Sequence, residues 1–205
     1  MTDTRDKKVY KTIKIGDQTW MAENLNYADS VTTKSLQNRS WCYNNVAANC
    51  AVAGRLYTWG AAIDSVKLAT DADNPQDCGY GMTCTLPAKV QGICPEGWHL
   101  PTNAEWETLF TEVGGSSTAG KIFKSQTGWC NNGNGTDGVG FSALPVGYRH
   151  NKGWFYYDCN DAYFWSATEL DAINAYRMDL TYHYEFAHLY YSLKNVGFSV
   201  RCLQD

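Results

Sequence analysis

Polar and apolar residues alternate in the first part of the chain. Residues 9–15 (VYKTIKI) alternate with a period of two, and Gly16-Asp17 separates them from residues 18–21. Such alternation is typical of a strand with one buried face, and a two-residue turn containing glycine commonly joins two such strands. The pattern predicts an opening β-hairpin.

A helical pattern begins at Thr102. The sequence Thr102-Asn103-Ala104-Glu105 is a capping box, in which the threonine side chain accepts a hydrogen bond from the Glu105 amide and the glutamate reaches back to Thr102. The apolar residues that follow recur at i, i+3, i+4 and i+7, and Gly114-Gly115 ends the helix. This apolar stripe consists of Trp106, Leu109, Phe110 and Val113.

Two weaker helices and a series of strands complete the pattern. Residues 55–66 fit a helix that Gly60 weakens, and residues 118–124 fit a shorter one. After a Gly/Asn-rich loop at 131–140, short runs separated by turn residues indicate an antiparallel meander. The predicted strands are residues 141–147, 154–157, 162–168, 175–182, 186–193 and 197–202.

These elements predict one α+β domain over residues 1–205, with residues 1–8 as a flexible start. Hydrophobic residues make up 44% of the chain, which favours folding over disorder. The net charge is −4 and there is no run of basic residues, so we expect neither a nucleic-acid partner nor an anionic-membrane patch. No apolar run reaches about 18 residues, so membrane insertion is not expected.

Cysteine is the most informative component of the composition. The eight cysteines contain no C-x-x-C pair, which argues against a zinc ribbon or a thioredoxin-type site. Two pairs are close in sequence and are expected to bridge local loops, whereas the remaining four allow several pairings. The expected disulfides are Cys42–Cys50, Cys78–Cys84, Cys130–Cys159 and Cys94–Cys202, the last two from spacing alone.

Disulfides require an oxidising compartment, so the chain is expected to be extracellular or on the cell surface. Met1 is then interpreted as a start that replaces a removed export signal. The alternative is a set of free cytosolic thiols.

Three stretches of the sequence are candidates for metal binding. The stretch His183-Tyr184-Glu185-Phe186-Ala187-His188 superficially resembles a metalloprotease signature, but its histidines are five residues apart rather than four, so a zinc site is not expected. Two loops offer hard oxygen ligands that would suit calcium, although Asp, Asn and Gly are also common turn formers. We expect no cofactor, with calcium as the alternative. The calcium candidates are Asp71, Asp73 and Asp77 in one loop and Asn134 and Asp137 in the other.

Aromatic residues are concentrated in the C-terminal half. The even positions from Tyr176 to Tyr190 form one continuous face if residues 175–191 are a single strand, and that face is either core or a binding surface. Consecutive aromatics on a strand cannot all point inward, so some rings are expected to be exposed. Tyr and Trp rings are favoured in binding surfaces. The candidate ligand-binding residues are Trp154, Tyr156, Tyr157, Tyr182, His183, Tyr184, Glu185, His188 and Tyr191.

Several blocks of sequence, taken in order, resemble the Fibrobacter major paralogous domain, a family of exported and surface proteins in fibre-degrading bacteria. The resemblance runs from about residue 5 to residue 205. The blocks are QTWMAENL at 18–25, CPEGWHLPT at 94–102, FSALP at 141–145, FWSATE at 164–169 and GFSVRC at 197–202.

More distantly, LPTNAEW at 100–106 and the GFSVRC ending are similar to the formylglycine-generating enzyme superfamily. This resemblance implies a C-type-lectin-like fold, with two main helices, a twisted antiparallel sheet and long disulfide-stapled loops. It also implies a ligand surface just before the terminal strand, as in the variable receptor proteins of diversity-generating retroelements. Formylglycine formation needs a reactive cysteine pair near the C-terminus, and Cys202 is the only cysteine after Cys159.

The sequence therefore predicts a secreted or surface-attached recognition domain without enzymatic activity. Its ligand is expected to be plant-cell-wall carbohydrate, or a surface protein, bound through the C-terminal aromatics. The alternatives are a diversified protein-ligand receptor of the same fold, an oxidase of the formylglycine-generating type, and a structural module within a larger surface protein.

Overall fold

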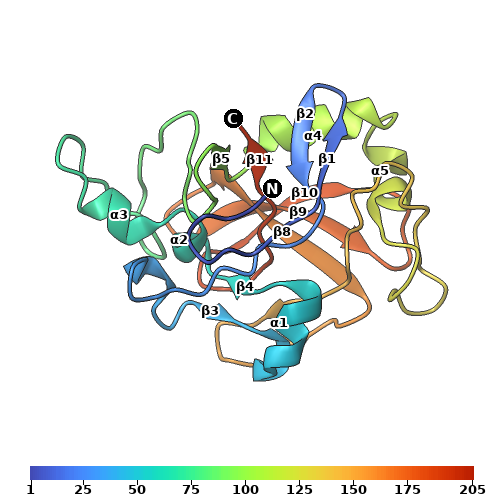
Figure 1. Cartoon of the computed structure of the whole chain (residues 1–205), viewed down its shortest axis with the longest axis horizontal. Helices are drawn as coiled ribbons and strands as arrows, with labels where there is room; N and C mark the ends of the chain where they lie inside the picture. Colours follow the sequence, from blue (N-terminus) through green and yellow to red (C-terminus); the bar gives the residue numbers. More distant parts are fainter.

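Two antiparallel sheets organise the computed structural model, which describes residues 1–205 (Figure 1). The first sheet has the strand order β1-β2-β11-β5. Its hairpin, β1 (Thr12–Ile15) and β2 (Gln18–Met21), confirms the predicted turn at Gly16-Asp17. The C-terminal strand β11 (Leu203–Gln204) lies between β2 and β5 (Trp98–His99), so the two ends of the chain meet in one sheet.

The second sheet is a three-stranded meander with the order β10-β9-β8. It consists of β8 (Asp161–Glu169), β9 (Asn174–Thr181) and β10 (His188–Leu193), each antiparallel to its neighbour. These strands confirm three of the predicted segments. The even positions from Tyr176 to Tyr190 do not form the one continuous face considered above, because the chain reverses in a turn at residues 182–187.

Two helices pack beside these sheets. Helix α4 (Asn103–Glu112) begins with the predicted capping box at Thr102, where both reciprocal hydrogen bonds are present. The apolar stripe of α4 is buried at Trp106, Leu109 and Phe110, and the helix contacts β8 and β9. Helix α5 (Ser116–Phe123) follows directly and confirms the second predicted helix.

The predicted helix over 55–66 is wrong in its first part. The chain forms β4 (Leu56–Tyr57), then α2 (Trp59–Ala62) and α3 (Ser65–Ala69). Backbone hydrogen bonds between Tyr57 and Phe198 hold β4 extended. Asp64, in the left-handed region with φ of 55°, separates the two helices. A tertiary pairing thus overrides the local helical preference.

The short elements not yet named are η1 (Lys34–Leu36), β3 (Ser40–Trp41), η2 (Tyr43–Asn45), α1 (Ala47–Ala53), β6 (Tyr148–Arg149) and β7 (Phe155–Tyr156), with β3 paired to β4 and β6 to β7.

Two further predicted strands, 141–147 and 197–202, are irregular in the structure. In the first, Ser142 and Gly147 have positive φ angles of 52° and 65°, which break an extended run. In the second, consecutive residues pair with different segments: Gly197 with Arg149, and Phe198 with Tyr57. This segment therefore connects several loops instead of extending one ladder.

The core consists of two buried clusters, and β8 lies between them. Phe164 belongs to the cluster under α4 and α5, whereas its neighbour Trp165 belongs to the cluster around Tyr57 and Phe198. Neighbouring side chains on a strand point to opposite faces, so one strand serves both clusters. Trp20 and Trp106, with ring centroids 4.5 Å apart, join the hairpin to α4.

All eight cysteines form disulfides, and the pairing is the one expected from the sequence. Cys42–Cys50 and Cys78–Cys84 close local loops, and Cys130–Cys159 joins two loops beside β8. Cys94–Cys202 links the segment before β5 to the segment before β11.

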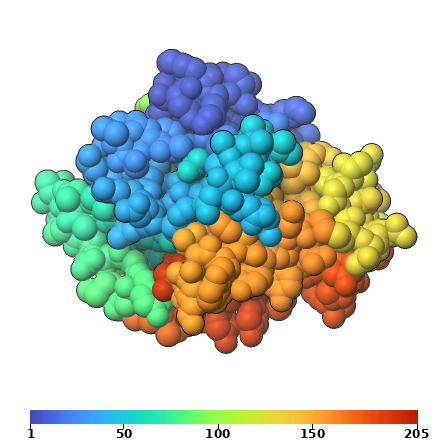
Figure 2. Space-filling model, turned by 90° about the horizontal axis from the view of Figure 1, so that it is seen from below, coloured from blue at the N-terminus to red at the C-terminus, as the bar shows by residue number.

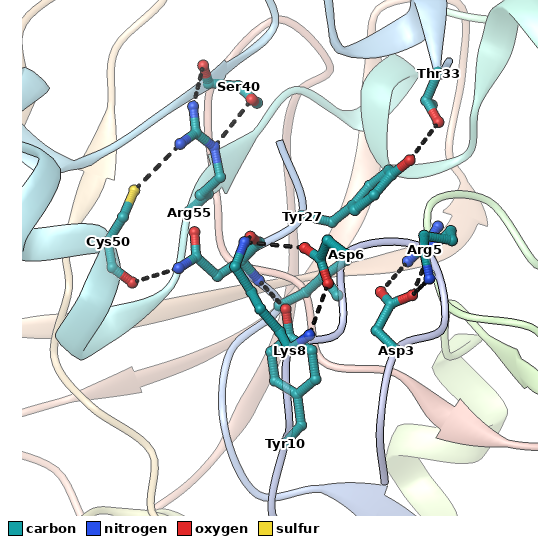
Figure 3. Close-up of polar contacts among 12 residues, drawn as sticks. Asp3, Arg5, Asp6, Lys8, Tyr10, Tyr27, Thr33, Ser40, Cys50 and Arg55 are labelled. Atoms are coloured by element: carbon teal, nitrogen blue, oxygen red, sulfur yellow. Dashed lines mark hydrogen bonds and ion pairs between the residues drawn. The ribbon is translucent and has the colours of Figure 1, made fainter. Parts of the chain in front are cut away.

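Residues 1–8, predicted to be a flexible start, instead form a closed turn against the rest of the chain. The Met1 amino group donates to the Tyr10 carbonyl, and Thr2 pairs with Val9. The buried Asp3 carboxylate receives hydrogen bonds from the Arg5 side chain, and the Arg5 guanidinium lies 3.8 Å from the centre of the Tyr27 ring (Figure 3).

Candidate ligand-binding surface

The β8-β9-β10 sheet has one core face and one outer face. Phe164, Met178 and Leu180 are completely buried on the core face. On the outer face, strand register places Tyr163 opposite Asp179. The same register places Tyr190 opposite Arg177 and His188 opposite Asp179, so aromatic and charged side chains alternate across the outer face.

A polar centre lies in the middle of this outer face, formed by Asp161, Tyr163, Arg177, Asp179 and Thr181. The Tyr163 hydroxyl donates to Asp161 Oδ2 at 2.7 Å. Arg177 Nε and Asp179 Oδ1 form an ion pair at 2.9 Å. The geometry of this contact is not that of a hydrogen bond, and neither atom has a hydrogen-bond partner elsewhere. Thr181 Oγ1 is also buried without a partner. Because an unpaired buried polar atom costs about 1–3 kcal/mol, this centre has unused hydrogen-bonding capacity.

Burial changes the protonation of this centre. It raises the pKa of Asp179 to about 7, with the Arg177 charge opposing the shift and the Asp161 charge adding to it. Burial also raises the pKa of Asp161, against the hydrogen bond from Tyr163. A carboxyl group that is protonated near neutral pH donates as well as accepts hydrogen bonds, which suits contact with hydroxyl groups.

A row of stacked rings, here called the aromatic ladder, follows the 182–187 turn into β10. Consecutive ring centroids lie 3.9–6.2 Å apart, and three of the pairs are stacked: Tyr184 with Phe186, His188 with Tyr190, and Tyr190 with Tyr191. Tyr184 and Tyr190 are each 46% exposed. The ladder consists of Tyr182, His183, Tyr184, Phe186, His188, Tyr190 and Tyr191.

A second aromatic group lies on the β6–β7 ribbon. Trp154 is 58% exposed and stacks on His150, which also contacts Tyr156. Tyr148 lies 5.7 Å from Tyr156, 5.8 Å from Tyr157 and 5.7 Å from Tyr163, and so connects this group to the polar centre.

Arg177 joins the two groups. Its guanidinium carbon lies 5.1 Å from the Tyr163 ring centre and 5.6 Å from the Tyr190 ring centre. The ladder, the polar centre and the ribbon aromatics therefore form one continuous region, here called the aromatic surface.

The turn that carries the ladder packs against α5 and the residue that follows this helix. Buried Lys124, just after α5, donates from Nζ to the carbonyls of Thr181, Tyr182 and Tyr184, at 2.9, 3.4 and 2.8 Å. A Cβ atom on Gly120 would lie 2.2 Å from the Phe186 carbonyl oxygen, so only glycine permits this approach. The turn is thus fixed by contacts with a distant segment.

Most of the residues predicted from the sequence are exposed on this surface. Trp154, Tyr156 and Tyr157 are exposed on the ribbon, and the exposed residues of the ladder region include Tyr184 and Tyr191. His183, Glu185 and His188 are exposed as well. Tyr182, in contrast, is half-buried and packs against the core cluster beneath α5.

Sequence reasoning missed the polar centre and two exposed ring positions, Phe186 and Tyr190. The centre carries a sequence signal: polar Arg177 and Asp179 alternate with buried Met178 and Leu180. This alternation indicates a polar outer face, but not which residues of other strands lie beside it.

The two calcium candidate loops use their oxygen atoms internally. Asp71 Oδ1 accepts from the amides of Asp73 and Asn74. Asn134 Oδ1 accepts from the Trp129 amide, and Asp137 accepts from Ser142. No three His, Cys, Asp or Glu side chains gather closely enough to hold a metal ion. Asp77 is exposed and takes no part in these contacts. Calcium binding stays a prediction.

The fold and this surface define a disulfide-rich α+β domain, and its four bridges indicate an oxidising, extracellular environment. The chain belongs to the Fibrobacter succinogenes major domain family, whose profile matches residues 13–204. No curated protein and no solved structure matches the chain. None of its helices has the length and apolar character needed to cross a bilayer.

Proposed function

We propose that this chain is a secreted or cell-surface recognition domain that binds plant-cell-wall carbohydrate through the aromatic surface, without catalysing a reaction. The row of stacked, exposed rings from Tyr184 to Tyr191 carries this proposal. Exposed aromatic side chains in one contiguous region mark interaction sites on soluble proteins.

The chemistry of the surface suits a sugar chain. The apolar face of a pyranose packs on Tyr and Trp rings, and its hydroxyl groups require nearby donors and acceptors. The ion pair of Arg177 and Asp179, whose side chains are 13% and 12% exposed, places a cation and a carboxyl group between the two aromatic groups. Because Lys124 and the disulfides fix the supporting loops, little conformational entropy is lost on binding.

We further propose that the fold is C-type-lectin-like. Three features support this assignment. The two longest helices lie beside an antiparallel sheet, the long loops are bridged by disulfides, and the C-terminal strand pairs with the opening hairpin. The aromatic surface directly precedes the terminal segment 197–204, the position in which the diversified receptors of the resembling superfamily bind their ligands.

A protein ligand is the second candidate, because a mixed Tyr, His, Arg and Asp surface also suits protein recognition. An oxidase of the formylglycine-generating type would need a reactive thiol pair, whereas every cysteine here is in a disulfide. Titration of the native protein with a thiol reagent is expected to detect no free thiol. Two reactive thiols would instead favour the oxidase.

The binding proposal is tested with Tyr184→Ala/Tyr190→Ala in pull-downs on insoluble neutral plant polysaccharides. Loss of both rings is expected to weaken binding at least about tenfold, which corresponds to about 1.4 kcal/mol. Unfolding stability is expected to change by less than about 1 kcal/mol because both side chains are surface residues. Val31→Ala is the control, since Val31 is an apolar side chain that is 77% exposed outside the aromatic surface.

A large loss of stability in the double variant would show that the rings are structural. If wild-type protein binds no polysaccharide but captures a defined surface protein, and the double variant does not, the protein-receptor candidate replaces the carbohydrate one.

A further inference from the structure

A cavity lies on the side of the β6–β7 ribbon that faces away from the aromatic surface. Neighbouring residues on a strand point to opposite faces, and here Tyr148 contacts the aromatic surface whereas Arg149 packs on Trp41, 3.7 Å from its ring centre. The cavity has a volume of about 480 Å³, within the usual size range of small-molecule sites. We call it the arginine groove, and the residues used below are Arg39, Trp41, Tyr80, Arg149, Asn151 and Asn195.

The groove contains two arginines without an ion-pair partner, and the exposed Asp77 carboxylate also lines the cavity without pairing to either of them. Neither Arg39 nor Arg149 forms an ion pair with a carboxylate. The only hydrogen bond of the Arg149 side chain runs from Nη1 to the His150 carbonyl at 3.4 Å. Its Nε atom is buried and has no partner. Burial without a compensating charge lowers the pKa of Arg149, so a bound anion would relieve an unfavourable charge.

The walls of the groove are fixed largely by contacts among its own lining residues, which include Cys78, Gly79, Met82 and Lys194. Lys194 is buried and donates from Nζ to the carbonyls of Gly79 and Met82, at 3.2 and 2.8 Å, and it also pairs with Glu169. The Cys78–Cys84 disulfide closes the same loop. Figure 2 shows the segments near residues 40, 80 and 150 side by side on one face, with part of the C-terminal region between the last two.

We propose that the arginine groove binds a carboxylate-bearing sugar, a uronic acid unit of an acidic polysaccharide. A guanidinium group pairs with a planar carboxylate through two parallel hydrogen bonds. Arg39, whose side chain donates only to the Ser65 hydroxyl, and Arg149 line this cavity without a carboxylate partner. The side-chain amides of Asn151 and Asn195 supply donors and acceptors for ring hydroxyls. Trp41 and the exposed Tyr80 add ring surface. This site is separate from the aromatic surface, and it requires a charged ligand.

The test is calorimetric titration of the whole chain with oligogalacturonides and oligoglucuronides, each compared with the neutral oligosaccharide of equal length. At least one acidic ligand is expected to bind at least tenfold more tightly than its neutral counterpart, with an affinity that falls as salt is added. Equal affinity for acidic and neutral sugars, no binding of either acidic sugar, or an affinity independent of salt would overturn the proposal.

Variants locate the binding. Arg149→Gln is expected to weaken uronide binding at least tenfold, and Arg39→Gln tests the same cavity if Arg149→Gln fails to fold. Lys152→Gln is the control, because Lys152 is an exposed cation three residues further along the same ribbon that does not line the groove, and it is expected to change binding less than twofold. If Lys152→Gln weakens binding as much as the arginine variants, only general charge attraction is present and the groove is not the site.

Two further measurements separate the proposals. Tyr184→Ala/Tyr190→Ala is expected to keep wild-type uronide binding, so the neutral-polysaccharide proposal and the groove proposal fail independently. Binding of a peptide with a free C-terminal carboxylate but not its amide, in a protein that binds no uronide, would assign the groove to peptide recognition and overturn the sugar proposal.

Discussion

Asp179 shows how burial at a single position sets the chemistry of the aromatic surface. Its carboxyl group lies among Arg177, Asp161 and Tyr163 on the outer face of the sheet. Desolvation favours the neutral form more strongly than the neighbouring guanidinium favours the charged form. The residue can therefore present either a donor or an acceptor near neutral pH.

The raised pKa of Asp179 predicts that its contribution to stability is present at low pH and is lost as pH rises from about 4 through about 7. Asp179→Asn removes the titration. The free energy of unfolding of this variant relative to wild type is expected to increase with pH in that interval, by up to about 1.4 kcal/mol per pH unit. Urea unfolding at pH 4.5, 6 and 8 measures it. The exposed Asp73→Asn serves as control, and a pH-independent difference for Asp179→Asn contradicts the assignment.

His99 is a second titrating residue with a structural role. It is 2% exposed, and its ring nitrogens lie 2.7 Å from Asp205 Oδ1 and 2.9 Å from Glu105 Oε1. Burial acts against the charged ring, but the two carboxylates outweigh it and raise the pKa of His99. The imidazolium thereby ties β5 to the capping box of α4 and to the end of the chain.

The raised pKa of His99 predicts that the charged ring stabilises the fold fully below about pH 6.5. This stabilisation is lost as pH rises through the raised pKa. Thermal melts of wild type between pH 6 and 9 should show this loss. His99→Gln, which keeps hydrogen-bonding capacity without titrating, should remove that part of the pH dependence. If the wild-type and variant melting curves shift in parallel, the charged ring does not contribute.

At the scale of elements, the 182–187 turn is positioned by α5 and by the residue that follows it. The Lys124 ammonium group donates its hydrogen bonds to backbone carbonyls at the turn, and burial lowers its pKa. The Ala187 amide donates to the Ser116 carbonyl at the start of α5. The aromatic ladder thus projects from a turn with a defined backbone, even though the turn lies outside any strand.

Lys124→Met is expected to destabilise the protein by about 2–4 kcal/mol, because it leaves buried carbonyls unpaired, and to weaken ligand binding by displacing Tyr184. Denaturant unfolding and polysaccharide pull-down measure the two effects. Lys121→Met, one turn earlier on α5, removes only an exposed ion pair with Glu185 of the turn and is expected to change both only slightly. Binding that survives in a folded Lys124→Met protein would mean that the turn is positioned by other contacts.

For the molecule as a whole, the disulfide framework connects segments at very different separations along the chain. Cys94–Cys202 closes a loop with a sequence separation of 108, whereas Cys42–Cys50 spans 8. The long bridge also joins the segments that lead into β5 and β11, which are neighbouring strands of the β1-β2-β11-β5 sheet.

Removing Cys94–Cys202 by Ala substitution at both positions is expected to cost about 4–5 kcal/mol, and removing Cys42–Cys50 about 2.5 kcal/mol, from loop-closure entropy alone. Comparison of the two double variants by denaturant unfolding tests this order. A smaller loss for the long-range pair would mean that the unfolded chain already keeps these segments close.

Local features were well predicted from the sequence. The hairpin at Gly16-Asp17, the capping box at Thr102 and the apolar stripe of α4 depend on residues within a few positions of one another. The helix predicted over 55–66 failed where Tyr57 pairs with Phe198, a contact between distant segments.

The sequence by itself determined the family, the α+β class, the two local disulfides and the concentration of aromatic residues in the C-terminal half, whereas the structure decided how the other four cysteines pair. Only the tertiary structure decided which rings face solvent, since that depends on the reversal at 182–187 and on Lys124, 57 residues away from Thr181. It likewise decided that Asp161 and Asp179 share a polar centre and that Arg39 and Arg149 share a groove. Periodicity reports the two faces of a strand, whereas the neighbours on each face come from segments that the chain brings together only on folding.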